Sequence, residues 1–370
     1  MIPVFKPSFN DEELEALKEP FKSGWIGLGP KTTEFEKKFA NYIGVKYAVA
    51  TNSCTASLHL ALRLMEIENY EVITTPMTFV STNHAILYNN GIPVFTDIYS
   101  DTLNINVDEI EKNITNKTKA IITVHYGGHS CDMDLILEIA KKYDLKVIED
   151  VAHGCGGEYK EKKLGSIGDI GCFSFHAVKN LATGDGGMIT TNDAEICEKL
   201  RKLRWLGVSR DTWDREEKDE KYSWYYSIED IGYKYHMNDI QAAIGLVQLK
   251  KLDSMNNRRR EISEAYTNAF KSVSWIEVPT IKKYAKCAYH NYVIKTDYRN
   301  ELNIYLQEKG ISTGVHYIPN NHYSMYRKFG QFTPVSDKVW KKLLTLPLYP
   351  DLSDSDVNMI IDTIKKFKKK

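Results

Sequence analysis

Short apolar runs rich in β-branched residues alternate with helical or turn segments through the first half of the chain. The runs lie at residues 47–50, 71–74, 93–96, 120–124 and 146–150. Strands that are buried on both faces have such continuous apolar runs, and their alternation with helices is typical of a mostly parallel sheet covered by helices on both sides. The pattern therefore predicts an α/β fold that binds its ligands at the C-terminal ends of the strands.

The remaining segments extend this pattern into a second, smaller unit. Helices are predicted at 11–22, 33–43, 59–64, 194–206, 301–308 and 355–366, and further strands at 172–175, 188–191 and 292–295. Another helix starts near Asn238, continues to Leu252 and has a strong apolar face. We expect it to connect a large domain, residues 1–245, to a small α+β domain, residues 246–370.

Charge and cysteine content exclude several classes of protein. The 370 residues include 49 basic and 49 acidic side chains, so nothing attracts the chain generally to nucleic acid or to a membrane surface. The sequence shows no signal-peptide layout and no apolar run near the ~20 residues of a membrane span. The six cysteines are scattered without a C-x-x-C pair, which argues against a zinc site and disulfides. We expect a cytoplasmic protein with reduced thiols and no metal.

Lys179 lies in the stretch with the strongest chemical signal, residues 171–187. A short apolar run precedes it, and a glycine cluster at Gly184, Gly186 and Gly187 follows it, which predicts a buried strand and a sharp return into the next strand. Desolvation at the end of a buried strand favours the neutral, nucleophilic form of a lysine. Most lysines are solvated surface residues, so this stretch needs support from the rest of the chain.

Other strand ends offer further polar or aromatic side chains. The turn at residues 52–56 opens a helix, where backbone N–H groups and hydroxyls can hold a phosphate, although an ordinary helix cap explains the turn equally well. Asp150 ends an apolar run, so its carboxylate must lie at a pocket mouth or beside a cation. Phe79, His153 and Ser174 each have an ordinary structural explanation when taken alone.

One cofactor, pyridoxal phosphate (PLP), accounts for these residues together. It needs a lysine for its aldehyde, a carboxylate for its ring nitrogen, an aromatic side chain against the ring and a cup for the phosphate. Lys179, Asp150, Phe79 and the pair Thr55 and Ser174 would supply these groups. A nucleotide is the alternative ligand, but the chain has neither a G-x-x-x-x-G-K-[ST] motif nor a G-x-G-x-x-G after its first strand.

An ordered set of motifs along nearly the whole chain resembles the DegT/DnrJ/EryC1/StrS family of sugar aminotransferases. The motifs include Trp25-Ile-Gly-Leu-Gly-Pro, Asn52-Ser-Cys-Thr-Ala, Pro76-Met-Thr-Phe-Val-Ser-Thr, Glu149-Asp-Val-Ala-His, Phe173-Ser-Phe-His-Ala-Val-Lys, Gly184-Asp-Gly-Gly, Gly232-Tyr-Lys-Tyr-His-Met-Asn-Asp and Gly314-Val-His-Tyr-Ile-Pro. The resemblance implies the PLP type I aminotransferase fold, with a mostly parallel, seven-stranded type of sheet in the large domain and a smaller α+β domain.

The resemblance also implies roles for individual residues. Lys179 matches the Schiff-base lysine, Asp150 the partner of the ring nitrogen, and Phe79 the stacking aromatic residue. His153 matches a Gln or His near the ring's phenolic oxygen, so we count it with the catalytic residues. The expected cofactor contacts are completed by Cys54, Thr55, Ser174, Lys234 and Asn238.

The family also implies a homodimer whose active sites are shared between the two chains. The partner chain commonly holds the phosphate through an Asn two residues before an Arg; here Lys234 and His236 occupy those positions. Asp185 stands where relatives usually have Glu.

The implied reaction is transamination, in which an amino donor, expected to be L-glutamate, passes its amino group to a ketone. Related dehydratases carry His at the lysine position, so Lys179 selects the aminotransferases. The expected acceptor is a nucleotide-linked keto-deoxysugar, as in polysaccharide biosynthesis. The expected substrate contacts are His316, Tyr317 and His322, together with Arg210 and Trp213 from a predicted long loop at 208–231.

Three alternatives remain open at this point. The same chemistry could act on a small phosphorylated ketone, such as dihydroxyacetone phosphate, or on a cyclitol ketone. A PLP-binding regulator without turnover is also conceivable, although the chain shows no appended DNA-binding or interaction domain.

Overall fold

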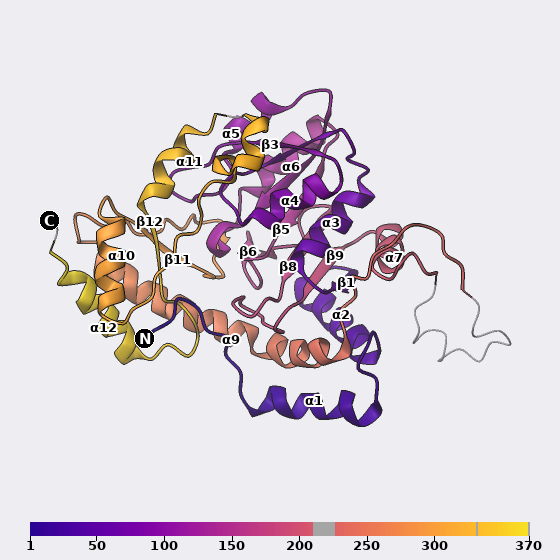
Figure 1. Cartoon of the computed structure of the whole chain (residues 1–370), viewed down its shortest axis with the longest axis horizontal. Helices are drawn as coiled ribbons and strands as arrows, with labels where there is room; N and C mark the ends of the chain where they lie inside the picture. The colour runs from indigo at the N-terminus through magenta and orange to yellow at the C-terminus, as the bar shows by residue number, and fades with distance from the viewer. Residues whose placement is uncertain (210–225, 331, 369–370) are drawn as a thin grey trace.

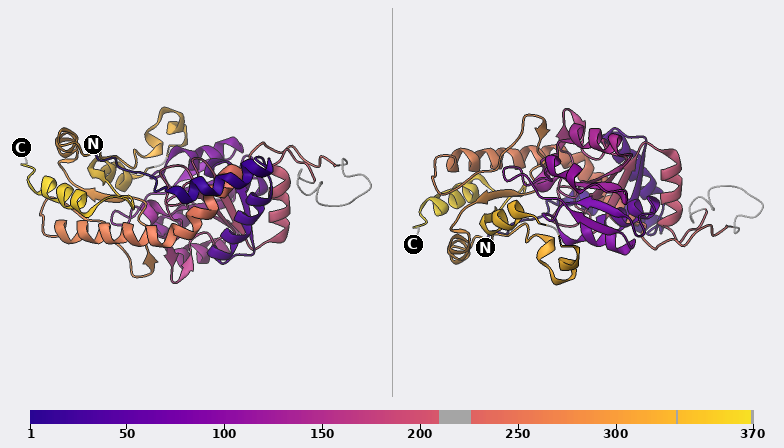
Figure 2. Two further views of the ribbon diagram at one scale, coloured as in Figure 1. Left: turned by 90° about the horizontal axis from the view of Figure 1, so that it is seen from below. Right: turned by 90° about the horizontal axis from the view of Figure 1, so that it is seen from above.

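The computed structural model describes residues 1–209, 226–330 and 332–368. A large α/β unit contains the central sheet, and a smaller unit with both chain ends lies beside it (Figure 1). Further views show the two units joined along one long helix (Figure 2). No helix among the described residues combines the length and the apolar character that crossing a membrane requires.

The central sheet has seven strands in the order β1-β9-β8-β5-β4-β2-β3. Their bounds are β1 Tyr47–Thr51, β2 Glu71–Thr74, β3 Ile92–Phe95, β4 Thr118–Val124, β5 Lys146–Asp150, β8 Ile170–Ser174 and β9 Gly187–Thr191. β9 is the one strand of this sheet that runs against the direction of the others, and it pairs antiparallel with β1 on one side and with β8 on the other. The predicted mostly parallel sheet of the seven-stranded type is therefore confirmed.

Helices cover both faces of this sheet because successive strand residues point to opposite sides. Val147 and Phe173 pack into one buried cluster, whereas their neighbours Ile148 and Cys172 pack into another. The first cluster holds α2 (Pro30–Ile43), α6 (Met133–Lys142) and the start of α9; the second holds α3 (Cys54–Leu64), α4 (Val80–Tyr88) and α7 (Ala194–Leu203). Strands buried on both sides explain the continuous apolar runs in the sequence.

The long helix α9 (Asp239–Phe270) joins the two units. It begins at Asn238, whose side chain caps the helix in a reciprocal pair with Gln241. Leu252 belongs to the core of the large unit, whereas Phe270 belongs to the core of the small one. The helix passes through the boundary predicted at 245/246 without interruption, so the division into two domains stays a prediction.

The small unit combines a two-stranded sheet with helices. Its elements are β11 (Tyr292–Lys295), β12 (Leu343–Leu346), α10 (Arg299–Glu308) and α12 (Asp354–Lys365). Helix α11 (Pro334–Val339) comes from the same part of the chain but bonds through its first residues to Asp97 of the large unit. The first residues of the chain return to this unit, since Ile2 pairs with Ile311. The chain then crosses to α1 (Asp11–Ser23), which lies against α9 (Figure 1).

Several boundaries differ from those predicted, for local reasons. Helix α3 begins at Cys54, five residues before the predicted start, because Ser53 accepts a bond from the N–H of Ala56 and caps it. Helix α9 continues beyond Leu252, the last residue of the predicted apolar face, to Phe270. The sequence pattern also did not predict α5 (Val107–Ile110) or the small sheet of β6 (Glu158–Tyr159), β7 (Lys162–Lys163) and β10 (Ala285–Lys286).

Candidate active site

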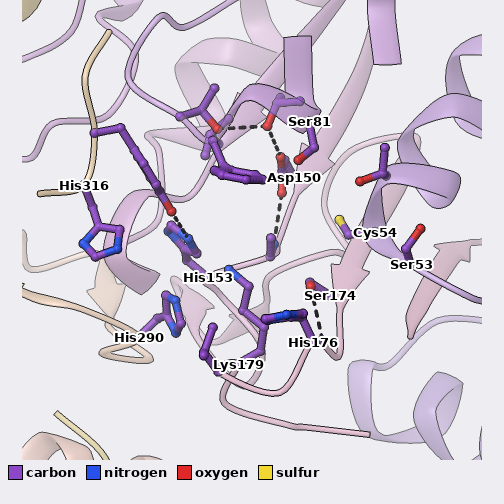
Figure 3. A pocket seen from close by; sticks show the side chains of 18 of the residues that line it. Ser53, Cys54, Ser81, Asp150, His153, Ser174, His176, Lys179, His290 and His316 are labelled. Atoms are coloured by element: carbon purple, nitrogen blue, oxygen red, sulfur yellow. Dashed lines mark hydrogen bonds between the residues drawn. The ribbon is translucent and has the colours of Figure 1, made fainter. Parts of the chain in front are cut away.

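A cavity of about 370 Å³ lies at the C-terminal ends of β5 and β8. The starts of α3 and α4 close one side, and residues near β11 and from the segment at 316–317 close the other (Figure 3). This is the position that an open parallel sheet offers to ligands, because its helix starts and strand ends meet there. The predicted residues Lys179, Asp150, His153 and Phe79 all line this one cavity.

Lys179 projects into the cavity from the connection between β8 and β9. The connection is closed by backbone bonds from Phe175 N–H to Gly186 O and from Thr183 N–H to Phe175 O, each 2.8 Å. Burial lowers the pKa of the lysine to about 8, and the nearby Cys54 and Asp150 only partly offset this effect. A substantial fraction of neutral amine near neutral pH makes Lys179 a competent nucleophile and base.

Asp150 is 3% exposed and ends β5 at the cavity. One carboxylate oxygen accepts a bond from the Thr82 hydroxyl at 2.7 Å, and the other accepts one from the N–H of Ala152 at 3.0 Å. Burial raises the pKa of Asp150, and these two bonds compensate only in part. The carboxylate can therefore still stabilise a positive charge placed before it.

The start of α3 forms a second polar end of the cavity. Ser53, Cys54 and Thr55 line it, and the first N–H groups of a helix lack partners within the helix. Ser174 approaches from β8, where it pairs with Gly187 of β9. A Cβ at Gly187 would lie 2.5 Å from the Ser53 carbonyl carbon, so glycine permits this close approach. Hydroxyl and N–H donors converge there, as a phosphate requires.

His153 is buried, and both of its ring nitrogens are engaged. The N–H of Gly127 donates to Nδ1 at 3.3 Å, so a neutral ring carries its proton on Nε2. Nε2 lies 2.9 Å from the Tyr317 hydroxyl and therefore donates to it. Burial and the nearby Lys179 hold the pKa of His153 well below its usual value, which keeps the ring neutral. The Tyr317 hydroxyl proton is then free for another acceptor, and Tyr317 lines the cavity.

Phe79 and His316 complete the predicted residues in the cavity. Phe79 is 58% exposed at the start of α4, with its ring 6.1 Å from that of Tyr317. His316 bonds through Nδ1 to the Thr345 hydroxyl at 2.8 Å, and burial lowers its pKa to about 4. An exposed aromatic ring at a cavity mouth is available to stack on a ligand.

The structure does not bring every predicted residue to this cavity. Lys234 and Asn238 line a second, more open cavity of about 540 Å³, which shares Ser53 and Asp185 with the first. Lys234 Nζ lies 3.5 Å from the centre of the Trp205 ring.

His322 also lies away from the main cavity, since it bonds instead to Asp337 at 2.7 Å. The predicted contacts Arg210 and Trp213 lie outside the described residues, as does most of the predicted loop at 208–231.

Sequence reasoning missed several side chains of the cavity. Thr82 orients Asp150, and its place in the first turn of a helix after a strand was the available signal. Phe5 and His290 also line the cavity. Neither has a motif around it: Phe5 lies in an irregular N-terminal segment, and His290 lies just before β11.

The side chains present fit PLP. A buried carboxylate without an ion-pair partner among the described residues suits the protonated ring nitrogen, and the hydroxyl-lined start of α3 suits the phosphate. Lys179 borders the same cavity as both. No group of His, Cys, Asp and Glu side chains suited to a metal ion occurs in the described part of the chain.

Comparisons with known proteins agree with this chemistry. Residues 7–365 match the sequence model of the DegT/DnrJ/EryC1/StrS aminotransferase family. The spore coat polysaccharide biosynthesis protein SpsC of Bacillus subtilis is 43% identical, with 100% of this chain and 97% of SpsC covered.

Solved structures are similar over almost the whole fold. Spr1654 of Streptococcus pneumoniae, a proposed sugar aminotransferase, superimposes in its PLP form with a TM-score of 0.91 at 32% identity, covering 98% of this chain and 97% of that one. Helicobacter pylori PseC, an aminotransferase involved in pseudoaminic acid biosynthesis, gives a TM-score of 0.91 at 29% identity, covering 99% and 98%.

Proposed function

The chain is a PLP-dependent aminotransferase of the DegT/DnrJ/EryC1/StrS family, and from this premise we propose that its amino donor is L-glutamate and its acceptor a nucleotide-linked keto-deoxysugar. One observation carries the chemistry: a single cavity joins Lys179, the buried Asp150 and the start of α3. The sugar acceptor is supported by the relatives, since SpsC is named for polysaccharide biosynthesis and PseC for pseudoaminic acid biosynthesis.

Lys179 is the proposed nucleophile and proton carrier. PLP, when bound, supplies an electron sink for the bond that breaks at the substrate carbon. Because the pKa of Lys179 is about 8, its neutral Nζ is available to hold the cofactor aldehyde. Once the amino donor has displaced it, Nζ can take the proton from the donor Cα and later return a proton at the carbon of the aminated acceptor.

Asp150 and the hydroxyl groups of the cavity are proposed to bind PLP and to orient it. The Asp150 carboxylate stabilises the charge on the ring nitrogen, while Thr82 and the N–H of Ala152 hold it in place. Thr55 and Ser174, with the N–H groups at Cys54, bind the phosphate. Phe79 covers the ring.

Further roles are proposed for His153, His316 and Tyr317, which line the cavity on the side away from the start of α3. His153 acts through Tyr317, whose hydroxyl proton it directs into the cavity. His316 and Tyr317 contact the acceptor.

A homodimer is proposed as the active assembly. Lys234 is exposed and lines the second cavity together with Asn238, outside the main cavity. This position suits a cation that contacts the phosphate of the PLP bound to a partner chain. A cytoplasmic location is proposed because all six cysteines are free and buried.

The decisive experiment uses the holoenzyme after glutamate has converted its cofactor to the amino form. Keto-sugar nucleotides, a cyclitol ketone and dihydroxyacetone phosphate are offered one at a time while the absorbance of the aldehyde form is followed. We expect its return with a keto-sugar nucleotide. Return only with one of the other ketones would keep the transamination and overturn the acceptor class, and no conversion by glutamate would overturn the donor.

A further inference from the structure

His290 lies in the cavity wall, where two aromatic rings fix its orientation. It is 2% exposed and comes from the segment just before β11. Its ring stacks on Phe5 at 5.1 Å with an interplanar angle of 2°, and on His153 at 4.4 Å and 30°. Figure 3 shows it beside His153 and Lys179. With neighbours stacked on the ring, only its edge is available for polar contacts.

The hydrogen bonds of Asn180 determine which nitrogen of His290 carries the proton. The Asn180 amide donates from Nδ2 to the carbonyl of Ala288 and to the Asn256 side chain, both at 2.8 Å. Its Oδ1 is therefore the end that faces His290 Nδ1, at 3.2 Å, and it can only accept. Nδ1 must carry a proton. Burial, together with the positive charge of Lys179, holds the pKa of His290 well below its usual value, so the ring is neutral and Nε2 is a bare acceptor.

This acceptor has no partner in the described part of the chain, although His290 lines the main cavity. Nε2 is not one of the fully buried side-chain atoms that lack a partner, so it keeps access to the cavity, where an unpaired acceptor on a ring held by stacking can receive a bond from a donor on a ligand. The charged or titratable groups acting on the ring are Lys179, His153, Arg259 and His316, none of which is acidic. Carboxylate and phosphate oxygens have no proton to offer to Nε2, whereas a hydroxyl does.

We propose that His290 is a specificity-determining residue whose Nε2 accepts a hydrogen bond from a ring hydroxyl of the sugar acceptor. The inference rests on the proposed function and refines it, because it requires a hydroxylated acceptor. Glutamate does not fit the role: its two ends are carboxylates, and its amino group is the one transferred. Asn180 is the positioning residue, since it sets the tautomer, and Phe5 supports the ring from the N-terminal segment.

The tautomer can be measured without any turnover. Nitrogen NMR of holoenzyme labelled with ¹⁵N-histidine should contain one neutral ring with protonated Nδ1 and bare Nε2 that is absent from His290→Phe. We expect this state to persist at mildly acidic pH. A spectrum in which the His290 signals show a protonated Nε2 would overturn the proposal, because the residue would then be a donor.

The recognition is tested by ligand binding. The probes are thymidine-diphosphate-linked 4-amino-4,6-dideoxyglucose and its 2-deoxy and 3-deoxy analogues, titrated calorimetrically into the holoenzyme with its cofactor in the amino form, which has no aldehyde to react with the amino sugar. His290→Phe keeps a ring between Phe5 and His153 but removes the acceptor. We expect this substitution to lower the affinity for the parent ligand about tenfold, the size of one hydrogen bond. The affinity for one deoxy analogue, the one that lacks the contacting hydroxyl, should stay as in the wild type. Phe5→Leu, which keeps the acceptor, should affect all three ligands alike.

The outcomes separate this inference from the proposed function. If the wild type binds the parent ligand and His290→Phe weakens all three ligands equally, or none, the hydroxyl contact is wrong and the proposed function stands. If the wild type binds none of the three and aminates no keto-sugar nucleotide, the proposed function fails and the inference fails with it.

Discussion

Two adjacent carboxylates on β5 have opposite surroundings. Glu149 is completely buried and accepts bonds from the N–H groups of Gly165, Ile167 and Gly168 at 2.7–2.9 Å and from His125 at 3.0 Å. Asp150, on the other face of the strand, receives only the bonds from Thr82 and Ala152 and borders the cavity. The hydrogen-bonding capacity of the Glu149 carboxylate is filled by the protein, whereas that of the Asp150 carboxylate is filled only in part.

The pKa directions reflect this difference. Burial raises the pKa of Glu149, but the bonds from His125 and the backbone outweigh burial and hold the pKa below its usual value. For Asp150 burial prevails and the pKa is raised. Burial alone therefore does not distinguish a structural carboxylate from a functional one; the difference lies in how much hydrogen-bonding capacity the fold leaves unused.

The largest expected effect comes from removing the lysine that faces Asp150. Lys179→Ala removes the only side chain proposed to hold the cofactor covalently, so borohydride should no longer fix PLP to the protein and transamination should cease. Mass spectrometry after reduction measures the fixation. The exposed Lys160→Ala serves as the control and should retain it. Retained fixation in Lys179→Ala would disprove the assignment.

Asp150→Asn tests the unsatisfied carboxylate. The variant should bind PLP but slow the half-reaction with glutamate on the order of 10²- to 10³-fold, as loss of one preorganised electrostatic partner does. Stopped-flow absorbance measures this rate. Because the pKa of Asp150 is raised in the fold, cofactor-free Asp150→Asn should be at least as stable as the wild type toward urea. Near-normal kinetics would contradict the proposed role.

Glu149→Gln tests the carboxylate whose hydrogen bonds are all made within the protein. In contrast to Asp150→Asn, it should lower the stability and leave the chemistry of the site intact. Removing the charge from a buried, fully bonded group should lower the free energy of unfolding by about 3–5 kcal/mol, as measured by urea denaturation. The folded fraction should still fix PLP. Glu34→Gln, at a solvent-accessible pair with Lys38, is the control and should cost about 1 kcal/mol or less. A stable but inactive Glu149→Gln would remove the distinction between the two carboxylates.

The smallest expected effect is the pH dependence of Lys179. With a pKa of about 8, its neutral fraction rises from about one-tenth at pH 7 to about nine-tenths at pH 9, so capture of PLP by cofactor-free protein should accelerate about tenfold and then level off. Borohydride trapping at timed intervals measures this rate. An increase that continues beyond pH 10 would indicate an ordinary lysine.

The same shift affects stability, with a defined sign. Between about pH 8 and pH 10.5 the unfolded chain binds more protons at this lysine than the folded chain does. Its contribution should therefore make the cofactor-free protein more stable as the pH rises through that window.

The sequence predicted the sheet and the two main residues of the site for a physical reason. Asp150 and Lys179 each follow an apolar run, and the C-terminal ends of parallel strands meet at one edge, so order along the chain was enough to bring them together. Phe5 and His290 could not be predicted in this way. They reach the cavity through the packing of the small unit. The periodicity of apolar residues in the sequence does not indicate which distant segment a loop will contact.

His322 illustrates the opposite difficulty. It lies only a few residues after Tyr317, yet it bonds to Asp337 of α11 and does not line the cavity. Proximity in sequence suggested a shared role, but the short 3-10 turn at Asn320–His322 changes the direction of the chain between the two side chains.

The anchoring of Asn180 has a consequence for motion. The Asn180 side-chain amide donates to Asn256, and the N–H of Ala182 donates to Gln248, about two turns earlier on α9. The backbone that follows Lys179 is therefore tied to the longest helix among the described residues. In the proposed reaction Lys179 leaves one carbon and reaches another during each cycle, and this movement is left to rotations of its four-carbon side chain. Such rotations take picoseconds to nanoseconds, whereas loop displacement is slower. We therefore expect the lysine to reposition much faster than any step that moves the backbone.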